Sequence, residues 1–376
     1  MTCLNCVTGK TEELIFKDGV VVQIKETIVG EGDLSFVGPG LIDIQINGIN
    51  GIDFNNPNIT RQDVVKATYH LLSIGVTTFL PTVITNADEN ICKIANTIHT
   101  ACLSDPVVND CIWGIHLEGP FISAVAGAKG AHDEKYIKAP DWELFRTYQQ
   151  AAGGKIKLIT LAPEGEGAYS FIRKCREEKI LVSIGHSMAD TEQIDAAIWA
   201  GASLATHVGN AVPLMLPRHP NILWDLLAAE ELSACMITDG LHIPDSFIKV
   251  VMKTKGEFAI IVSDSTCFTG MKAGEYENHI GGKVILDKEK RVSLQSTPGL
   301  LAGAAKSLPE NVEYLINHQL STLSDSWRMA SLNVAKMLAK SNATFSDRND
   351  LVIFKLSENG IKVECVVKNG TILFEQ

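Results

Sequence analysis

Short apolar runs recur along the middle of the chain, and stretches with the spacing of amphipathic helices separate them. Within these stretches apolar residues repeat at i, i+3 and i+4, which predicts helices over Thr191–Ala200 and Asp245–Lys255. The apolar runs are short enough to be buried strands. They predict eight strands, at Leu41–Asn47, Val76–Thr82, Ile112–Glu118, Ile156–Leu161, Leu181–His186, Ser203–His207, Ala234–Thr238 and Ala259–Asp264.

Eight strands that alternate with helices are typical of a (β/α)8 barrel. A doubly wound open sheet is the competing arrangement. The count of eight and the polar residues at the strand ends favour the barrel. We therefore predict an α/β fold with a TIM-type barrel over residues 39–341, closed by helical residues 303–341.

The two chain ends have a different pattern, with short strands and tight turns. FKDGVVVQI lies near the N-terminus, and NDLVIFKL, IKVECVV and KNGTILFEQ lie near the C-terminus. Asp18-Gly19 and Asn369-Gly370 are hairpin turn signals. We expect residues 1–38 and 342–376 to join in one small β-sandwich domain beside the barrel.

Composition narrows the class of protein. Hydrophobic residues make up 45% and charged residues 20% of the 376 residues, which indicates a globular chain. The net charge of −11 and the lack of Lys/Arg runs argue against nucleic acid or an anionic membrane as a partner. One or two local Arg or His residues could still bind a small phosphate.

The sequence also predicts the cellular compartment of the protein. The N-terminus has no basic segment followed by an apolar one, and no apolar run reaches the length of a membrane span. The nine cysteines are scattered, which favours a reduced, cytoplasmic protein over a disulfide framework. Cys3 and Cys6 form a lone CxxC, which we interpret as part of an ordinary N-terminal strand.

Polar residues mark the C-terminal ends of the predicted strands. They are Asp43, Gln45, Asn47, Thr82, Glu118, Glu164, His186, His207, Asp239, His242 and Asp264. In a barrel these ends converge on one face, where catalytic residues are expected. Buried strands do not need carboxylates or imidazoles there for stability, so the pattern predicts a metal site.

Three of these residues form a ligand set. Glu118 lies in GIHLEGPF, His186 in VSIGHSMAD and His207 in ATHVGNA. One carboxylate and two imidazoles leave a fourth position open, as hydrolytic metal sites do. Asp264, in IIVSDST, could accept the proton of a metal-bound water. His116 shares the face of Glu118 one layer deeper, either as a partner of the ligands or as a core histidine.

A series of motifs runs through the chain in a fixed order: GPGLIDIQING, GVTTFLPT, HLEGPF…KGAH, TLAPE, GHSMAD, THVGNA, DGLHIP, SDST and LLAGAAKSL. Together they resemble the N-acetylglucosamine-6-phosphate deacetylase family of the amidohydrolase superfamily, from about Asp18 to about Leu338. Any one motif alone is a weak signal, whereas the ordered series is specific.

The resemblance implies roles for individual residues. Glu118, His186 and His207 match the metal ligands, and Asp264 matches the catalytic acid and base. His132, in KGAH, matches a residue that polarises the acetyl carbonyl. Substrate contacts match Ala131, His132, Asn210, Ala211, Arg218, His242, Leu301, Ala302 and Gly303. Arg218 and His242 match side chains at the sugar phosphate, and the family is commonly a homodimer whose subunits complete each other's phosphate pockets.

The first strand departs from many amidohydrolases. They bind a second metal through His-x-His, where this chain has Gln45-Ile46-Asn47. Amide oxygens are poorer ligands than imidazole for zinc or iron. The resemblance is therefore to the branch with one divalent ion per subunit. Zinc is the first choice, while iron, cobalt and manganese also suit these ligands.

The predicted reaction is hydrolysis of the acetamide of N-acetylglucosamine 6-phosphate to glucosamine 6-phosphate and acetate, in amino-sugar catabolism or recycling. We expect the protein to bind this small phosphorylated sugar as its partner, and to bind neither nucleic acid nor a membrane. Two alternatives remain: a deacetylase for N-acetylgalactosamine 6-phosphate, and a non-catalytic scaffold with the amidohydrolase fold. A scaffold usually lacks metal ligands, whereas this chain has Glu118, His186, His207 and Asp264.

Overall fold

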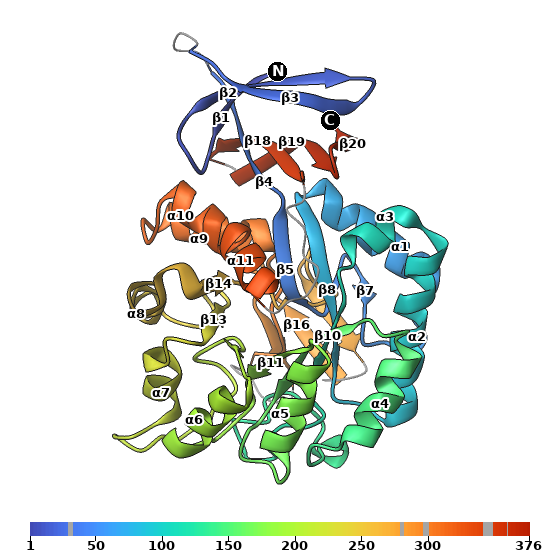
Figure 1. Ribbon diagram of the computed structural model, residues 1–376, viewed down its shortest axis with the longest axis vertical. Helices are drawn as coiled ribbons and strands as arrows, with labels where there is room; N and C mark the ends of the chain where they lie inside the picture. Colours follow the sequence, from blue (N-terminus) through green and yellow to red (C-terminus); the bar gives the residue numbers. More distant parts are fainter. Residues whose placement is uncertain (29–32, 279–281, 296–300, 341–348, 359) are drawn as a thin grey trace.

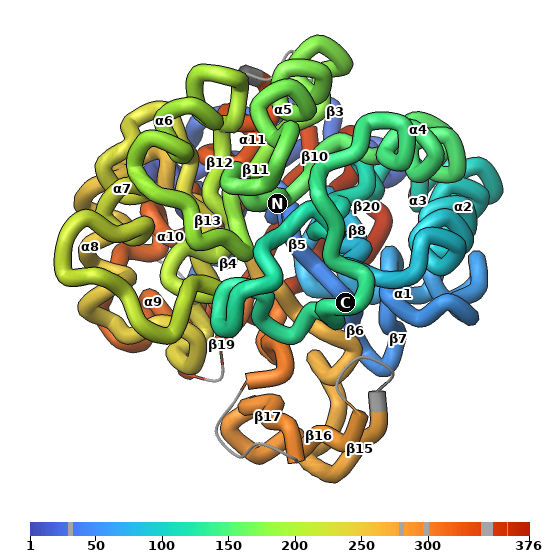
Figure 2. The backbone as a smooth tube through the Cα atoms, turned by 90° about the horizontal axis from the view of Figure 1, so that it is seen from below, coloured from blue at the N-terminus to red at the C-terminus, as the bar shows by residue number. Residues whose placement is uncertain are grey.

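The computed structural model describes residues 1–28, 33–278, 282–295, 301–340, 349–358 and 360–376. It has a parallel strand barrel surrounded by helices and a smaller β domain built from both chain ends (Figure 1). Viewed from below, the helices encircle the strands (Figure 2). The predicted fold class is therefore confirmed.

Eight parallel strands form the barrel sheet, in the order β14-β13-β12-β11-β10-β9-β8-β5. Their bounds are β5 Leu41–Ile46, β8 Val76–Ile84, β9 Ile115–Glu118, β10 Ile156–Leu161, β11 Leu181–Ile184, β12 Leu204–Ala205, β13 Ser233–Met236 and β14 Ala259–Ile261. The segment after β14 closes the ring against β5. Asp264 N donates to Gln45 O at 2.9 Å, and Asn47 N donates to Ser265 O at 2.7 Å.

Helices cover the outside of the barrel. Their bounds are α1 Arg61–Ser73, α2 Asp88–Ser104, α3 Pro106–Cys111, α4 Trp142–Ala151, α5 Ala168–Glu177, α6 Thr191–Ala200, α7 Ile222–Ala228, α8 Asp245–Lys255, α9 Leu308–Asn317, α10 Leu323–Met329 and α11 Leu332–Lys340, with short 3₁₀ turns η1 Glu134–Tyr136 and η2 Gly256–Phe258. The bounds predicted for α6 and α8 are those observed.

Two apolar cores hold the barrel. The larger lies between strands and helices and includes Phe79, Ile159 and Ile248. The second joins Ile44 of β5 and Leu158 of β10 to residues of α11. Burial of these side chains is the main favourable term in folding, at about 25 cal/mol per Å² of apolar surface.

The predicted helical segment 303–341 is divided into pieces. Residues 303–307 are not helical, and α9, α10 and α11 follow as three separate helices. Residue 341 lies outside the described residues, as do residues 342–348 of the predicted terminal domain. Ser307 caps α9 with a capping box to Glu310, and Thr322 caps α10. These caps start separate helices within the segment that was predicted to be helical.

Strands from both ends of the chain form the terminal β domain. They close in the order β1-β2-β3-β20-β19-β18-β4, with β1 also paired to β4. Their bounds are β1 Thr2–Asn5, β2 Thr11–Lys17, β3 Val20–Glu26, β4 Ser35–Pro39, β18 Leu351–Ser357, β19 Gly360–Lys368 and β20 Thr371–Glu375. The closed sheet surrounds a core that includes Leu14, Val37 and Ile353.

Both predicted hairpin turns are present. Asp18 and Gly19 join β2 to β3 with φ of 52° and 75°, and Asn369 and Gly370 join β19 to β20 with φ of 49° and 82°. Two successive left-handed residues are the signature of a type I′ turn, which suits the twist of a two-residue hairpin.

The sequence did not predict the small sheets. β15 Gly274–Asn278, β16 Gly282–Leu286 and β17 Val292–Leu294 form an antiparallel sheet that projects from one side of the barrel (Figure 2). β6 Gly48–Ile49 and β7 Ile52–Asp53 form a second, very short one. Within the described ranges, no helix has the length and apolar character needed to cross a membrane.

Candidate metal centre and active site

The key side chains lie at, or just beyond, the C-terminal ends of the barrel strands. Glu118 is the last residue of β9, whereas His186, His207 and Asp264 follow the observed ends of β11, β12 and β14. These three residues have left-handed φ values of 52°, 24° and 47°. Such a φ interrupts regular strand pairing, which explains why the strands are shorter than predicted.

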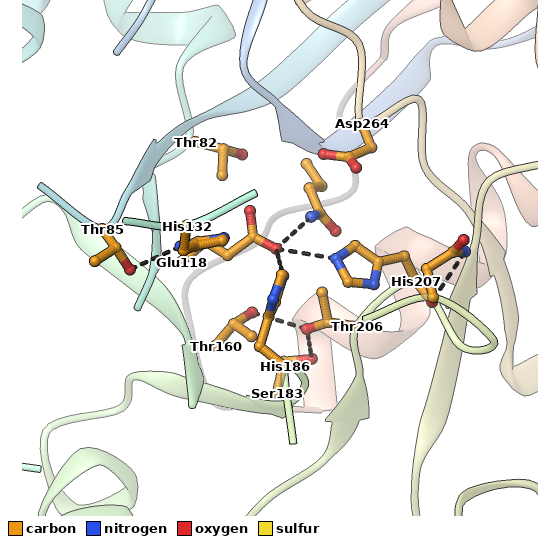
Figure 3. A network of polar contacts seen from close by, with 12 residues as sticks. Thr82, Thr85, Glu118, His132, Thr160, Ser183, His186, Thr206, His207 and Asp264 are labelled. Atoms are coloured by element: carbon orange, nitrogen blue, oxygen red, sulfur yellow. Dashed lines mark hydrogen bonds and ion pairs between the residues drawn. The ribbon is translucent and has the colours of Figure 1, made fainter. Parts of the chain in front are cut away.

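Glu118 is the hub of a buried polar cluster (Figure 3). Its Oε1 lies 3.1 Å from His186 Nε2 and 3.1 Å from His207 Nε2. The side-chain amide of Gln45 donates to the same oxygen at 2.9 Å. Among the described residues, Glu118, His186 and His207 are the one group of three His, Cys, Asp or Glu residues that could hold a metal, with ligand atoms within 4.8 Å of one another.

The contacts of His186 fit a bound cation. Its Nδ1 donates to the carbonyl oxygen of Ala128 at 3.0 Å, so a neutral ring presents an unprotonated Nε2 to Glu118. Two acceptors then lie 3.1 Å apart with no proton between them. Ligand atoms about 2.1 Å from one tetrahedral ion lie roughly 3.4 Å apart, which is close to this separation. The donor set and its geometry therefore fit a divalent metal.

Charge in the cluster is balanced between the carboxylate and the imidazoles. Without a metal, the imidazoles of His186 and His207 can instead carry a proton on Nε2. Burial favours a neutral Glu118, but hydrogen bonds from these protonated nitrogens outweigh burial and hold the pKa of Glu118 well below the ordinary value. Burial opposes a charged His207, but the hydrogen bond and charge of Glu118 raise its pKa overall. His207 Nδ1 has no hydrogen-bond partner among the described residues. A proton on His207 therefore competes with a metal ion for the site.

Asp264 lies on the same face of the barrel, above the cluster (Figure 3). Its Oδ1 accepts a hydrogen bond from Asn47 Nδ2 at 2.7 Å. Burial raises the pKa of Asp264 to about 6, and the negative charge of Glu118 adds to the rise. A carboxyl group with this pKa can both accept and release a proton near neutral pH.

His132 lies against His186, one of the three residues that could hold a metal. The two ring centroids are 4.3 Å apart at 62°, and His132 Nδ1 lies 2.7 Å from Thr85 Oγ1. Burial lowers the pKa of His132 to about 3, and the neighbouring His186 adds to this effect. His132 is therefore neutral at physiological pH and can act as a hydrogen-bonding group without carrying charge.

His116 lies below the cluster, in the layer that the sequence predicted. Its Nδ1 contacts Ile44 O at 3.0 Å and its Nε2 contacts Thr160 Oγ1 at 2.8 Å. Burial lowers its pKa to about 4. With both ring nitrogens occupied and no charge, His116 is a neutral core histidine that supports the floor of the site.

The residues expected at the sugar phosphate lie in different environments. His242 Nδ1 contacts Asp239 Oδ2 at 2.7 Å, and Asp239 Oδ1 accepts the backbone amides of Leu241 and His242. His242 is thereby fixed in orientation. Arg218, in contrast, is exposed in the loop between β12 and α7 and stays apart from the buried cluster.

The other predicted substrate residues lie in loops that follow barrel strands or precede α9. Asn210 and Ala211 follow His207 by three and four residues, and Asn210 Nδ2 donates to His207 O at 3.3 Å. Ala131 is exposed beside the buried His132. Residues 301–303 precede Ala304, whose carbonyl accepts both the amide and the hydroxyl of Thr266.

Sequence reasoning missed several supporting side chains. Thr85 contacts His132, and Asn55 Nδ2 lies 3.4 Å from Asn47 Oδ1. Gln45 and Asn47 were predicted at the active face and as poor metal ligands, but not as hydrogen-bond donors to Glu118 and Asp264. Their position at the strand end beside the two carboxylates was the available signal.

Comparison with protein-family models gives no match. N-acetylglucosamine-6-phosphate deacetylase of Bacillus subtilis is 33% identical over 343 residues, covering 89% of this chain and 84% of the relative. The human enzyme of the same name is 27% identical, covering 97% of this chain and 88% of the relative. The solved structure of N-acetylglucosamine-6-phosphate deacetylase from Pasteurella multocida superimposes with a TM-score of 0.84 and 26% identity, covering 100% of this chain and 98% of that one. The chain belongs to the N-acetylglucosamine-6-phosphate deacetylase family of metal-dependent amidohydrolases.

Proposed function

We propose that this protein hydrolyses the acetamide of N-acetylglucosamine 6-phosphate, giving glucosamine 6-phosphate and acetate. The observation that carries the proposal is the pair of 3.1 Å contacts from Glu118 Oε1 to two imidazoles, with the carboxylate of Asp264 on the same barrel face. Family membership supplies the substrate class, because the relatives carry that enzyme name.

Glu118, His186 and His207 would hold one divalent ion. When bound, the ion lowers the pKa of water and polarises a carbonyl group. Zinc is the ion we propose first, because a carboxylate and two imidazoles are typical zinc ligands; iron, cobalt and manganese accept the same donors.

Asp264 is the proposed general base and then general acid. It takes a proton from the water whose oxygen attacks the acetyl carbon, and it gives that proton to the nitrogen as the C–N bond breaks. The pKa of about 6 suits both steps. General acid–base help of this kind contributes roughly 10²–10⁴-fold in rate.

His132 is the proposed partner of the carbonyl oxygen. Its ring is buried, neutral and held by Thr85 and by the edge contact with His186. A neutral imidazole N–H can donate to the oxygen as negative charge develops on it. Because the ring is neutral, the enzyme does not have to bury a charge at this position before the reaction begins.

Phosphate recognition is assigned to His242 and Arg218. Asp239 fixes the His242 ring, so its remaining nitrogen has a set direction. Ala131, Asn210, Ala211 and the turn at residues 301–303 would contact the sugar. Remote binding of the phosphate holds the amide in register for attack.

We also propose a homodimer that works in the cytoplasm. Leu214 and Met215 are 81% and 87% exposed in the loop that carries Arg218. Large apolar side chains exposed side by side are typical of association surfaces. If a second subunit packs against this loop, Arg218 of one subunit would lie near the phosphate pocket of the other.

An acetate-release assay on a matched panel tests the proposal. The metal-loaded protein should release acetate from N-acetylglucosamine 6-phosphate faster than from N-acetylgalactosamine 6-phosphate or from unphosphorylated N-acetylglucosamine. A preference for the galactosamine epimer would change the substrate assignment. Tight metal binding without release from any of them would indicate a non-catalytic scaffold.

A further inference from the structure

Glu164 follows β10 and takes no part in the mechanism above. Its Oε2 accepts a hydrogen bond from Ser187 Oγ at 2.6 Å, and its Oε1 accepts one from the backbone amide of Met188 at 2.8 Å. Ser187 and Met188 directly follow His186. One carboxylate therefore fastens the two residues that come after a metal-binding side chain.

The backbone at His186 needs such support. Its φ of 52° is unfavourable for a residue with a side chain. The preceding Gly185 lies so close to the neighbouring strands that a Cβ there would approach Thr206 Cβ at 2.6 Å and Thr160 Cγ2 at 2.9 Å. On the other side, the amide of Ser123 donates to His186 O at 2.9 Å.

The hydroxyl of Ser187 completes the turn. It donates to Glu164 and accepts the backbone amide of Ala189 at 3.0 Å. Ser187 itself is 1% exposed and Glu164 is half-buried, so this contact is partly shielded from solvent. Hydrogen bonds to a carboxylate acceptor are stronger than those between neutral groups.

We propose that Glu164 is a positioning residue of the metal centre. By fixing the turn after His186, it holds the imidazole so that Nε2 faces Glu118 Oε1. The inference rests on the proposed function, because it assigns His186 to the metal. It extends that function by naming a residue that touches neither metal nor substrate and yet sets how long the metal stays bound.

Metal release measures this role without any substrate. The protein is loaded with Co²⁺, and the loss of the visible Co²⁺ absorption is followed after an excess of EDTA is added. Glu164→Ala removes both hydrogen bonds. We expect release at least roughly tenfold faster than in the parent, with an altered absorption band, since partners of metal ligands typically change affinity 10–100-fold.

Glu164→Gln is the rescue variant. Its amide oxygen can accept from Met188, and its NH₂ can donate to Ser187, so release should stay near the parent rate. Ser187→Ala removes one of the two Glu164 hydrogen bonds, together with the contact from the Ala189 amide, and should give an intermediate rate. It also keeps the test open if Glu164→Ala does not fold. Thr191→Val is the matched control, because it removes the Thr191–Asp225 hydrogen bond at 3.1 Å further along the same segment.

A purely structural role gives a different result. Glu164→Ala would then lower the melting temperature of the metal-free protein but leave the Co²⁺ band and its release rate unchanged. That result, or an unchanged rate in Ser187→Ala, overturns the proposal. If the parent protein binds no Co²⁺ at all, the proposed function fails instead, so the two failures are distinguishable.

Discussion

The side-chain amide of Asn47 donates a hydrogen bond to Oδ1 of Asp264 at 2.7 Å, so the end of β5 orients a carboxylate that follows β14. Asn55 lies behind Asn47, with its Nδ2 3.4 Å from Asn47 Oδ1 and 3.0 Å from the carbonyl of Thr82. The Asn47 amide is thereby held with its NH₂ toward Asp264. A donor in this position favours the ionised form of the carboxylate.

Replacing Asn47 with Ala should therefore raise the pKa of Asp264. If Asp264 is the general base, activity falls as the pH drops through its pKa, so the acidic limb of kcat/KM should move to higher pH. We expect metal content to stay unchanged. The measurement is a pH profile of the metal-loaded variant beside Asn58→Ala, a surface change in the same segment; a limb that stays in place or moves down would contradict the assignment.

Asp264→Asn should keep the metal and lose most turnover. The amide has the same shape but cannot take up the proton of water, and the expected loss is roughly 10²–10⁴-fold in kcat. Metal analysis and acetate release on the same sample make the check. Near-parent turnover in a metal-replete Asp264→Asn protein would remove Asp264 from the mechanism.

One metal per subunit is expected. A second ion would need ligands at Gln45 and Asn47, whose NH₂ groups already donate to Glu118 and Asp264. Elemental analysis of protein loaded with excess zinc and then desalted should give a ratio near one. A firmly bound ratio near two would show that these amides rearrange to bind metal.

Arg218→Ala tests the phosphate assignment. A hydrogen bond to a charged group contributes about 1.5–3 kcal/mol, so kcat/KM on N-acetylglucosamine 6-phosphate should fall roughly ten- to hundredfold. The unphosphorylated sugar should be almost unaffected. Arg146→Ala, on the exposed face of α4, is the control. Equal losses on both sugars would mean that Arg218 supports the fold or the subunit contact.

Asp43 predicts a pH-dependent stability. It is fully buried, its Oδ2 has no hydrogen-bond partner among the described residues, and burial raises its pKa to about 7. Between about pH 4 and pH 7 the folded protein holds this proton more tightly than the unfolded chain does. Raising the pH through that window therefore removes stability, on the order of 4 kcal/mol at most.

Asp43→Asn should remove this dependence, because the amide cannot ionise and keeps the Oδ1 acceptor for Ser263 and Gln45. Its melting temperature relative to the parent should be higher at pH 8 than at pH 5. Asp195→Asn, on the exposed side of α6, provides the surface reference. If the difference in melting temperature between Asp43→Asn and the parent is the same at pH 5 and pH 8, ionisation of Asp43 does not control the stability of the protein.

The strand ends were predictable because topology alone brings them together. Alternating strands and helices place Glu118, His186 and His207 on one face, and their chemistry then indicates a metal. The left-handed turns at His186 and Asp264 were not predictable, since they depend on contacts with neighbouring strands. The contacts of Glu164 with the turn after His186 were not predictable either, because they join residues that are far apart in the sequence.

The β15–β17 sheet was missed for a different reason. Its strands are short and have mixed polarity, and their apolar residues pack in a small separate core with Phe268 and Ala305. A pattern that buries only a few side chains gives a weak periodic signal. The barrel strands, buried on both faces, gave a strong one.

The closed sheet of the terminal β domain has a consequence for synthesis. β1 and β4 are made first, but β18 must pair with β4, and β20 must meet β3, before the ring is complete. Throughout translation of the barrel, the early strands keep unpaired edges, which are sites of mispairing and aggregation. The sheet of the terminal domain can therefore close only after residues 351–375 have left the ribosome. A chain stalled before that point would have an open sheet beside the barrel.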